Sequence, residues 1–264
     1  MGCMMWSKID KKSGVSETIG FIIIFGIVMT GIGIVTLYGY PALMQEQQNA
    51  NIKNMEKNML VLQSDLRSLT FKSVPYQETS IQVSGGSLTI PKDPNPNWPY
   101  FTISIPGNST TFYPGELKFI SSDGMANIAL ENGAVHIRYW SDASGSAMLA
   151  EPSWFYDSIT QTYVIQFIGL NASSDFGQTG IGTIRMQINE PPNQEVINLT
   201  GKTATVSYKA NPEEDYMIAW KNYFNKPELG MHNMIINGRN VSADLDSSAK
   251  WLVIKRYNVT VLSL

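Results

Sequence analysis

The sequence is short of cysteine, histidine and charge, and each shortage narrows the classes of protein it can encode. Cys3 is the only cysteine, which excludes an intramolecular disulfide and a multi-cysteine metal site. The two histidines, His136 and His232, each lie in an apolar, strand-like run and are expected to be structural. Charged residues make up 16% of the chain and its net charge is −3, so no basic field attracts nucleic acid.

Familiar catalytic motifs are missing as well. The sequence holds no G-x-S-x-G, no P-loop, no Rossmann glycine pattern and no H-E-x-x-H. We therefore predict no catalytic residue, no cofactor and no metal, and a chain that is not an enzyme.

A long uncharged segment stands near the start. Thr18–Gln45 is 28 residues without a charge, and Ile19–Tyr40 is nearly all apolar or small. As a helix, the latter rises about 33 Å, enough for the ~30 Å hydrocarbon core of a bilayer. A cleavable secretory signal would have an apolar region of only ~7–15 residues. The pattern predicts a transmembrane helix over residues 15–44.

Lysine placement sets the expected orientation of that helix. Lys8, Lys11 and Lys12 precede the span, and the twelve residues after Tyr40 contain no lysine. Because positive residues favour the cytoplasmic side, the N-terminus is predicted to be cytoplasmic and the rest of the chain to lie at the cell surface.

Small residues form one face of the span. Gly26, Thr30 and Gly33 fall at i, i+4 and i+7, which allows another helix to approach closely. The alternative is that Gly and Thr are simply common in membrane helices.

An amphipathic pattern continues over residues 45–72, where a stalk helix is predicted. Its apolar seam alternates spacings of three and four through Ile52, Met55, Met59, Leu62, Leu66 and Leu69. Pro41 predicts a kink between span and stalk. The seam could face a coiled-coil partner or the protein's own β domain. Less than three full heptads favours the second.

After Pro75 the texture becomes β-rich. About ten short alternating or β-branched runs are separated by Gly, Asn, Pro and Ser, which predicts an antiparallel, sandwich-like outer domain over residues 75–264. One helix is expected from Asn211 to about Asn225, ended by Pro227. The fold class is therefore α+β.

Five N-x-S/T sequons all lie in the domain predicted to be external, which makes them usable for glycosylation. Asn108, Asn171, Asn198 and Asn240 are the predicted sites. Asn258 falls inside a predicted strand and is expected to be unmodified.

The stretch Lys11-Lys12-Ser13-Gly14-Val15-Ser16-Glu17-Thr18-Ile19-Gly20-Phe21, followed by IIIFGIV, resembles the start of archaeal type IV pilin-like proteins. These have a short basic leader, a small residue, a motif such as V-S-E-V-L-G-F and an apolar helix. The resemblance is specific over residues 11–40 and is closest to a subgroup with glutamate in the motif and a β-rich outer domain.

The resemblance implies that residues 1–14 are a basic leader, cleaved by a prepilin peptidase between Gly14 and Val15. It also implies a helix that packs with other pilin-like subunits in a filament core. Glu17, in the first turn of that helix, could pair there with a neighbour's freed amine, or it could mark the membrane boundary.

Two functional readings follow. In the first, the chain is a pilin-like subunit of an archaeal cell-surface type IV filament. In the second, it is a non-polymerising, single-pass anchored envelope protein whose outer β domain binds a partner or glycan.

Overall fold

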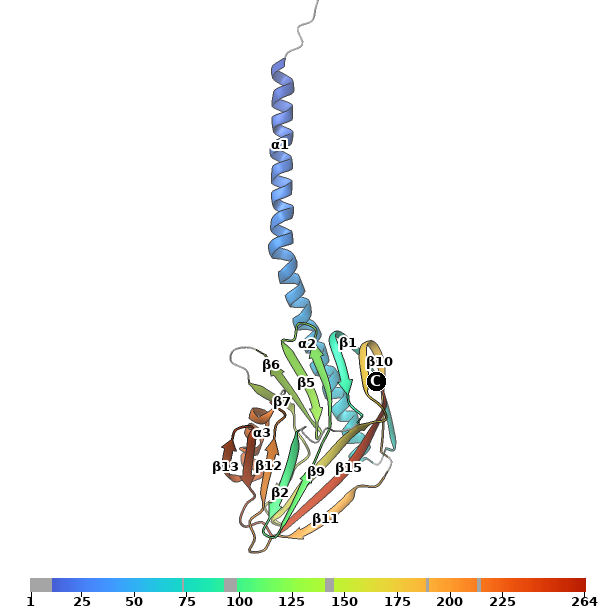
Figure 1. The fold of residues 1–264 in the computed structure, drawn as a ribbon, viewed down its shortest axis with the longest axis vertical. Helices are drawn as coiled ribbons and strands as arrows, with labels where there is room; N and C mark the ends of the chain where they lie inside the picture. The colour runs from blue at the N-terminus through green and yellow to red at the C-terminus, as the bar shows by residue number, and fades with distance from the viewer. Residues whose placement is uncertain (1–10, 73, 93–98, 141–144, 189, 213–214) are drawn as a thin grey trace, which may run out of the picture. The chain divides into compact units, whose positions relative to one another are not determined.

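The computed structural model describes residues 11–72, 74–92, 99–140, 145–188, 190–212 and 215–264, and of residues 11–17 the backbone alone. The chain divides into two compact units, Met1–Ala50 and Asn51–Leu264. The long helices come first in the chain and the strands follow, with the short helix α3 (Met217–Phe224) among the later strands, as the colours of Figure 1 show.

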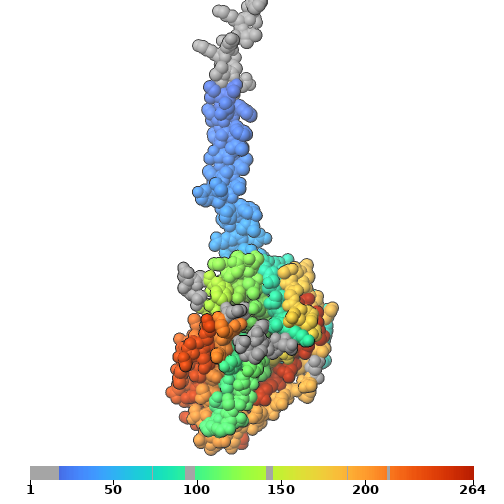
Figure 2. Space-filling view, in the orientation of Figure 1, coloured from blue at the N-terminus to red at the C-terminus, as the bar shows by residue number. Residues whose placement is uncertain are grey.

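The N-terminal helices are α1 (Lys11–Ile34) and α2 (Tyr40–Phe71), joined by the π-helical segment η1 (Val35–Gly39). Within the described residues, one helical stretch is long and apolar enough to cross a membrane. Its apolar side chains are exposed, with Phe21 at 70% and Leu37 at 71%. In the space-filling view of Figure 2 the described part of this segment is blue. A helix that is apolar all round and uncovered is suited to lipid.

The predicted kink at Pro41 takes the form of a widened turn. The backbone N–H of Tyr40 donates to the carbonyl oxygen of Val35, five residues back. Proline lacks an N–H, and its ring crowds the carbonyl four residues before it, here that of Leu37. The π-turn directly before Pro41 takes up that irregularity within the helix.

The strands of the described residues form two sheets (Figure 1). The ten-stranded sheet has the order β7 (Ser146–Ala150), β6 (Ala134–Tyr139), β5 (Ala126–Glu131), β4 (Glu116–Ser121), β1 (Tyr76–Ile90), β10 (Phe176–Ile188), β15 (Trp251–Ser263), β9 (Thr162–Ala172), β8 (Phe155–Asp157), with β11 (Asn193–Asn198) paired to β15. The five-stranded sheet has the order β13 (His232–Asn237), β14 (Asn240–Asp244), β12 (Thr205–Lys209), β2 (Tyr100–Ile105), β3 (Asn108–Phe112).

One core lies between α2 and the ten-stranded sheet. All six seam residues are buried, none more than 4% exposed: Ile52, Met55, Met59, Leu62, Leu66 and Leu69. The Gln63 amide adds a polar anchor, donating to the carbonyl of Gly133 at 2.9 Å in the β5–β6 turn. The seam therefore faces the protein's own β domain, as the short heptad run favoured. Residues from Asn51 onward belong to the same compact unit as the strands, so this part of α2 is part of the folded domain.

A second core lies on the other face of the same sheet. There the five-stranded sheet and α3 (Met217–Phe224) pack over an aromatic cluster that includes Phe101, Trp154, Phe167 and Trp220. A short 3-10 turn, η2 (Pro227–Leu229), follows α3. The two sheets form the predicted sandwich, and α2 packs on the outer face of the ten-stranded sheet. The α+β class is confirmed.

Strands β9 and β15 take part in both cores. On β15, Leu252 and Ile254 point into the second core, whereas Tyr257, Val259 and Val261 point into the first. Alternate residues of a strand point to opposite faces, so one straight strand serves both. These two strands pair in parallel, from Trp251 beside Thr162 to Val261 beside Ala172, which is the one exception to the predicted antiparallel pairing among the described strand pairs.

Two local predictions are also corrected. Two of the short runs counted as separate strands in the sequence, Thr79–Val83 and Ser87–Ile90, belong to one strand, β1, which has a register shift between Val83 and Leu88. A Cβ on Gly86, inside that shift, would clash with the Phe119 ring and the Ile120 carbonyl. The helix expected from Asn211 begins only at Met217, whose N–H donates to Asp215 at 2.9 Å. Glu213 and Glu214, which follow Asn211 at the expected start of this helix, lie outside the described residues.

Candidate functional site

The small-residue face predicted for assembly lies on α1. A Cβ added at Gly26 or Gly33 would meet no described atom within 4 Å. Between them, the Thr30 hydroxyl donates to the carbonyl of Gly26 at 2.7 Å. The only hydroxyl of this face is thus satisfied within the helix, as a lipid environment requires. The face can accept a second helix without leaving a polar group unpaired.

The predicted processing residues Gly14 and Val15, and Glu17 after them, lie in the first two turns of α1. Only their backbone is described, so the roles expected of their side chains stay predictions.

The sequons differ in access. Asn108 and Asn198 are exposed, whereas Asn171 and Asn240 are half-buried. The buried side-chain oxygen of Asn240 has no hydrogen-bond partner in the described residues. Asn258 is exposed even though it lies in β15, because its face of the sheet is open at that position. Exposure ranks Asn108 and Asn198 above the other two predicted glycosylation sites.

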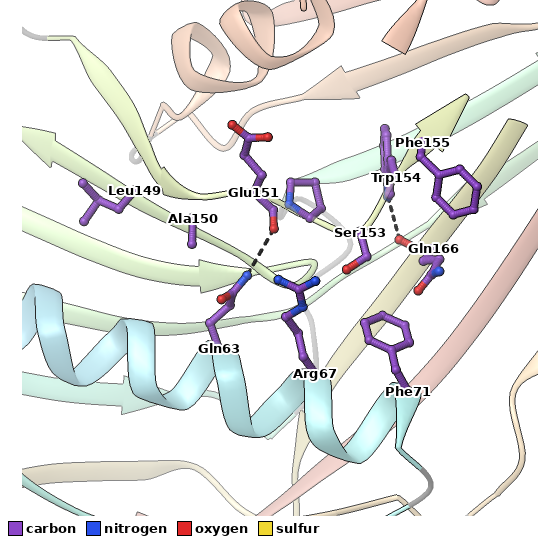
Figure 3. Close-up of a pocket in the computed structure, with 11 residues that line it drawn as sticks. Gln63, Arg67, Phe71, Leu149, Ala150, Glu151, Ser153, Trp154, Phe155 and Gln166 are labelled. Carbon is purple, nitrogen blue, oxygen red and sulfur yellow. Dashed lines mark hydrogen bonds between the residues drawn. The ribbon is translucent and has the colours of Figure 1, made fainter. Parts of the chain in front are cut away.

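A cleft of about 630 Å³ opens beside the C-terminal end of α2. It lies between that helix, the β7–β8 connection and β9, and Figure 3 shows the side chains around it. The lining residues are Gln63, Arg67, Phe71, Leu149, Ala150, Glu151, Pro152, Ser153, Trp154, Phe155 and Gln166.

Two of these lining residues have a polar group for which the described residues provide no partner. The Arg67 side chain points from α2 toward the 151–153 segment (Figure 3), is exposed, and has no ion-pair partner in the described residues. The Gln166 side-chain oxygen is buried and unpaired. Glu151 instead forms an ion pair with Lys226 near α3. Arg67 is therefore the unpaired charge of the cleft, a guanidinium suited to carboxylate.

Buried polar groups also gather where α3 meets the sheet. Glu131, fully buried, accepts hydrogen bonds from Trp220 Nε1 at 3.1 Å and from the Tyr208 hydroxyl at 3.3 Å. Burial, with the nearby Glu131 and Glu116 carboxylates, raises the pKa of Tyr208. His136 stacks on Tyr216 with ring centroids 5.2 Å apart. These groups lie inside the domain and attach α3 to β5 and β6.

His136 was expected to be structural, and the structure buries it completely. Neither ring nitrogen has a hydrogen-bond partner among the described residues, and burial lowers the pKa of His136 to about 3. His232 lies in a strand as expected, but its side chain is exposed. Neither histidine joins the cleft, and no group of three His, Cys, Asp or Glu in the described residues is placed to hold a metal.

The burial of His136 predicts an acid-sensitive domain. The folded state holds the ring neutral, whereas the unfolded chain binds a proton below the ordinary pKa of 6.5. The contribution of His136 to the free energy of unfolding is therefore fully present above pH 6.5. It is lost as the pH drops toward 3, which lowers the free energy of unfolding by about 4–5 kcal/mol, at about 1.4 kcal/mol per pKa unit. Urea unfolding of the full chain in detergent, followed by tryptophan fluorescence across this range, measures it.

Two substitutions calibrate that pH dependence. His136→Phe keeps an aromatic ring against Tyr216. It should flatten the slope of the free energy of unfolding against pH between 6.5 and 3, whatever it does to stability at neutral pH. His232→Asn, at the exposed histidine, should keep the wild-type slope. Equal slopes in all three proteins would mean that acid acts through other groups.

The fold and these sites define the class: an α+β protein with one N-terminal helix of membrane-spanning length and composition, followed by a β-rich folded unit. The chain belongs to a family of unknown function, DUF7289, which matches residues 14–262.

Two relatives, both named "Uncharacterized protein" and both from Archaeoglobus fulgidus, are similar over shorter stretches. One is 33% identical over 81 residues, which is 31% of this chain and 27% of the relative. The other is 27% identical over 79 residues, 30% of each. The chain thus spans less than a third of the length of these curated relatives. No solved structure matches.

Proposed function

We propose that the chain is a pilin-like subunit, major or minor, of an archaeal cell-surface type IV filament. The observation that carries the proposal is the apolar helix itself. Its side chains from Thr18 to Met44 are almost all exposed, and its small-residue face at Gly26, Thr30 and Gly33 is open to a partner. Because it also begins with the pilin-like stretch from Lys11 to Phe21, filament assembly is the function it supports best.

The folded unit supports the same assignment, because different parts of the helices contact different surroundings. The apolar seam side chains within residues 52–69 of α2 pack in the core of the β-rich domain. No described side chain before Ala50 belongs to that core. One part of the helical region thus carries the domain while the other remains available for membrane insertion and for other subunits. The proposal assigns no catalytic role to the chain.

Removal of the leader by a prepilin peptidase is part of the proposal. Similarity to the family begins at Gly14, so residues 1–13 lie outside the shared region. We expect cleavage between Gly14 and Val15, and Gly14→Val should block it because the peptidase requires a small residue there. Intact-mass analysis of native protein measures the result. Native protein that keeps its full leader would refute the cleavage.

Topology is the second element of the proposal. The lysines before the span favour an orientation with the folded unit outside the cell. Protease added to intact cells should therefore digest the domain, and exposed sequons such as Asn108 and Asn198 should carry glycans. A domain that is protected until the cells are lysed would reverse the orientation.

The cleft with Arg67 favours a second candidate, a non-polymerising anchored envelope protein whose β domain binds a partner or glycan. The two candidates differ in self-association. A wild-type protein that stays monomeric under every native extraction would favour the second.

A further inference from the structure

Part of the ten-stranded sheet is left without cover where α2 ends. On β15, the helix covers Val261, Val259 and Tyr257, and its last residue, Phe71, meets Tyr257 edge-on at 5.7 Å. The next residues on the same face are Lys255, Val253 and Trp251, which remain half-exposed or exposed. We name this uncovered area, made by β8, β11 and the first halves of β9 and β15, the open face.

A straight apolar row crosses the open face. Phe155 pairs with Val164, Val164 with Val253, and Val253 with Val196, so four neighbouring strands each contribute one side chain. Phe155 is 50% exposed and Val196 is 55% exposed. Neighbouring strands lie about 4.8 Å apart, so the row forms a flat, evenly spaced strip.

Polar rows lie on both sides of the strip. On one side, Lys255 pairs with Gln166 and with Gln194. On the other, Trp251, 42% exposed, pairs with Thr162 and Asn198. An apolar platform between rows of amide, hydroxyl and amine groups matches a pyranose ring, which has apolar C–H faces and hydroxyls around its edge.

The open face is continuous with the cleft, because Phe155 and Gln166 belong to both. Two cations mark this combined surface, Arg67 in the cleft and Lys255 beside Gln166. Neither has an ion-pair partner among the described residues. Two nearby acids are engaged elsewhere: Glu151 with Lys226, and Glu195 with Arg256 at 3.3 Å on the opposite face of the sheet. A third acid, Asp157, continues the row of Trp251 and Thr162 on the open face and accepts hydrogen bonds from the Ile159 N–H and the Thr160 hydroxyl. Of these three acids only Asp157 has no ion-pair partner among the described residues, against two such cations.

We propose that the open face and the cleft together bind an acidic saccharide chain, with sugar rings on the apolar strip and carboxylates at Arg67 and Lys255. Unpaired cations call for an anionic ligand. The core of a protein–protein interface is depleted of charge, whereas here a lysine stands beside the centre of the strip. This inference concerns the folded unit and does not depend on filament assembly.

The test is calorimetric titration of the full chain in detergent micelles, made in a host that does not attach N-glycans, so that Asn198 stays bare. The probe is hexagalacturonate, and galactohexaose is its neutral counterpart. We expect saturable binding of the acidic probe that weakens as salt is added, and much weaker binding of the neutral one.

Matched variants locate the site. Arg67→Gln and Lys255→Gln should each weaken binding roughly tenfold or more, because each removes a charged hydrogen bond. Trp251→Ala should weaken it through lost stacking. Lys57→Gln, at another exposed lysine on α2, is the control and should bind like wild type. All four positions are at the surface, and thermal unfolding confirms that each variant is folded.

Three results would overturn the proposal: no saturable binding, equal affinity for the two probes, or wild-type affinity in both charge variants. If instead the Trp251 and Lys255 variants lose self-association while no sugar binds, the open face is a contact between copies of the chain. Because none of these readouts requires a filament, failure here leaves the filament proposal standing.

Discussion

Leu66→Ala is expected to lower the free energy of unfolding of the β-rich unit by about 2–5 kcal/mol. Leu66 is fully buried between α2 and the ten-stranded sheet, so the shorter side chain both loses apolar burial and leaves a cavity. Such a loss is a large part of the ~5–15 kcal/mol that stabilises a typical domain. Urea unfolding of the full chain in detergent, followed by tryptophan fluorescence, measures the change.

The control lies on the same helix. Leu60 is 37% exposed, and Leu60→Ala should change the free energy of unfolding by only about 0.5 kcal/mol. Because the seam packs within one chain, unfolding should also be independent of protein concentration. Equal effects at Leu60 and Leu66, or a midpoint that rises with concentration, would show that the seam faces another chain.

The second large effect is expected in the membrane. Gly26→Leu or Gly33→Leu should abolish self-association, seen as loss of filaments or of cross-linked oligomers. Lipid gives no hydrophobic drive for helices to associate, so close backbone contact at small residues must supply the attraction. Leucine holds the backbones apart but keeps the helix apolar enough to insert. The domain should still fold, because its core contains no residue of the span.

The span itself provides a matched control. Gly31 lies about 140° around the helix from Gly26, at 100° per residue, and it too has open space around it. Gly31→Leu should therefore leave oligomers intact, whereas charge reversal at Glu17 should weaken them mildly. Loss of oligomers in all three glycine variants would mean that bulk anywhere on the helix is disruptive, and loss in none would mean that this face is not the contact.

The helical half of the protein could be predicted from the sequence because its signals are local. The uncharged run from Thr18 gives the span, and the three-four spacing from Ile52 to Leu69 gives a buried seam. Pro41 gives an irregular turn. Each of these depends on residues within a few turns of one another, where helix geometry fixes which side chains share a face.

Much of the β-rich half depends on contacts between distant residues, which a single sequence does not contain. Short strands such as β3, β8 and β11 have too few residues to show a clear period. The parallel pairing of β9 with β15 brings together residues about 90 positions apart. Glu131 and Trp220 are also far apart in the sequence and meet only in the fold. The one sequence signal of the buried polar cluster was therefore the position of His136 in an apolar run.

The candidate sites divide along the same line. The residues proposed for processing and assembly, from Gly14 to Gly33, come from one continuous stretch and could be named from it. The open face and its cleft could not, because Arg67, Phe155, Gln166, Val196 and Lys255 come from five separate elements. They form one surface because α2 ends at Phe71, beyond which this face of the sheet is uncovered.

The central claim is that this chain assembles into a surface filament after its leader is removed. Its most direct test is mass spectrometry of filaments sheared from cells of the source organism. The account predicts that the chain is found in the filament fraction with Val15 as its N-terminal residue. A chain found only in the membrane fraction, with its leader still attached, would contradict it.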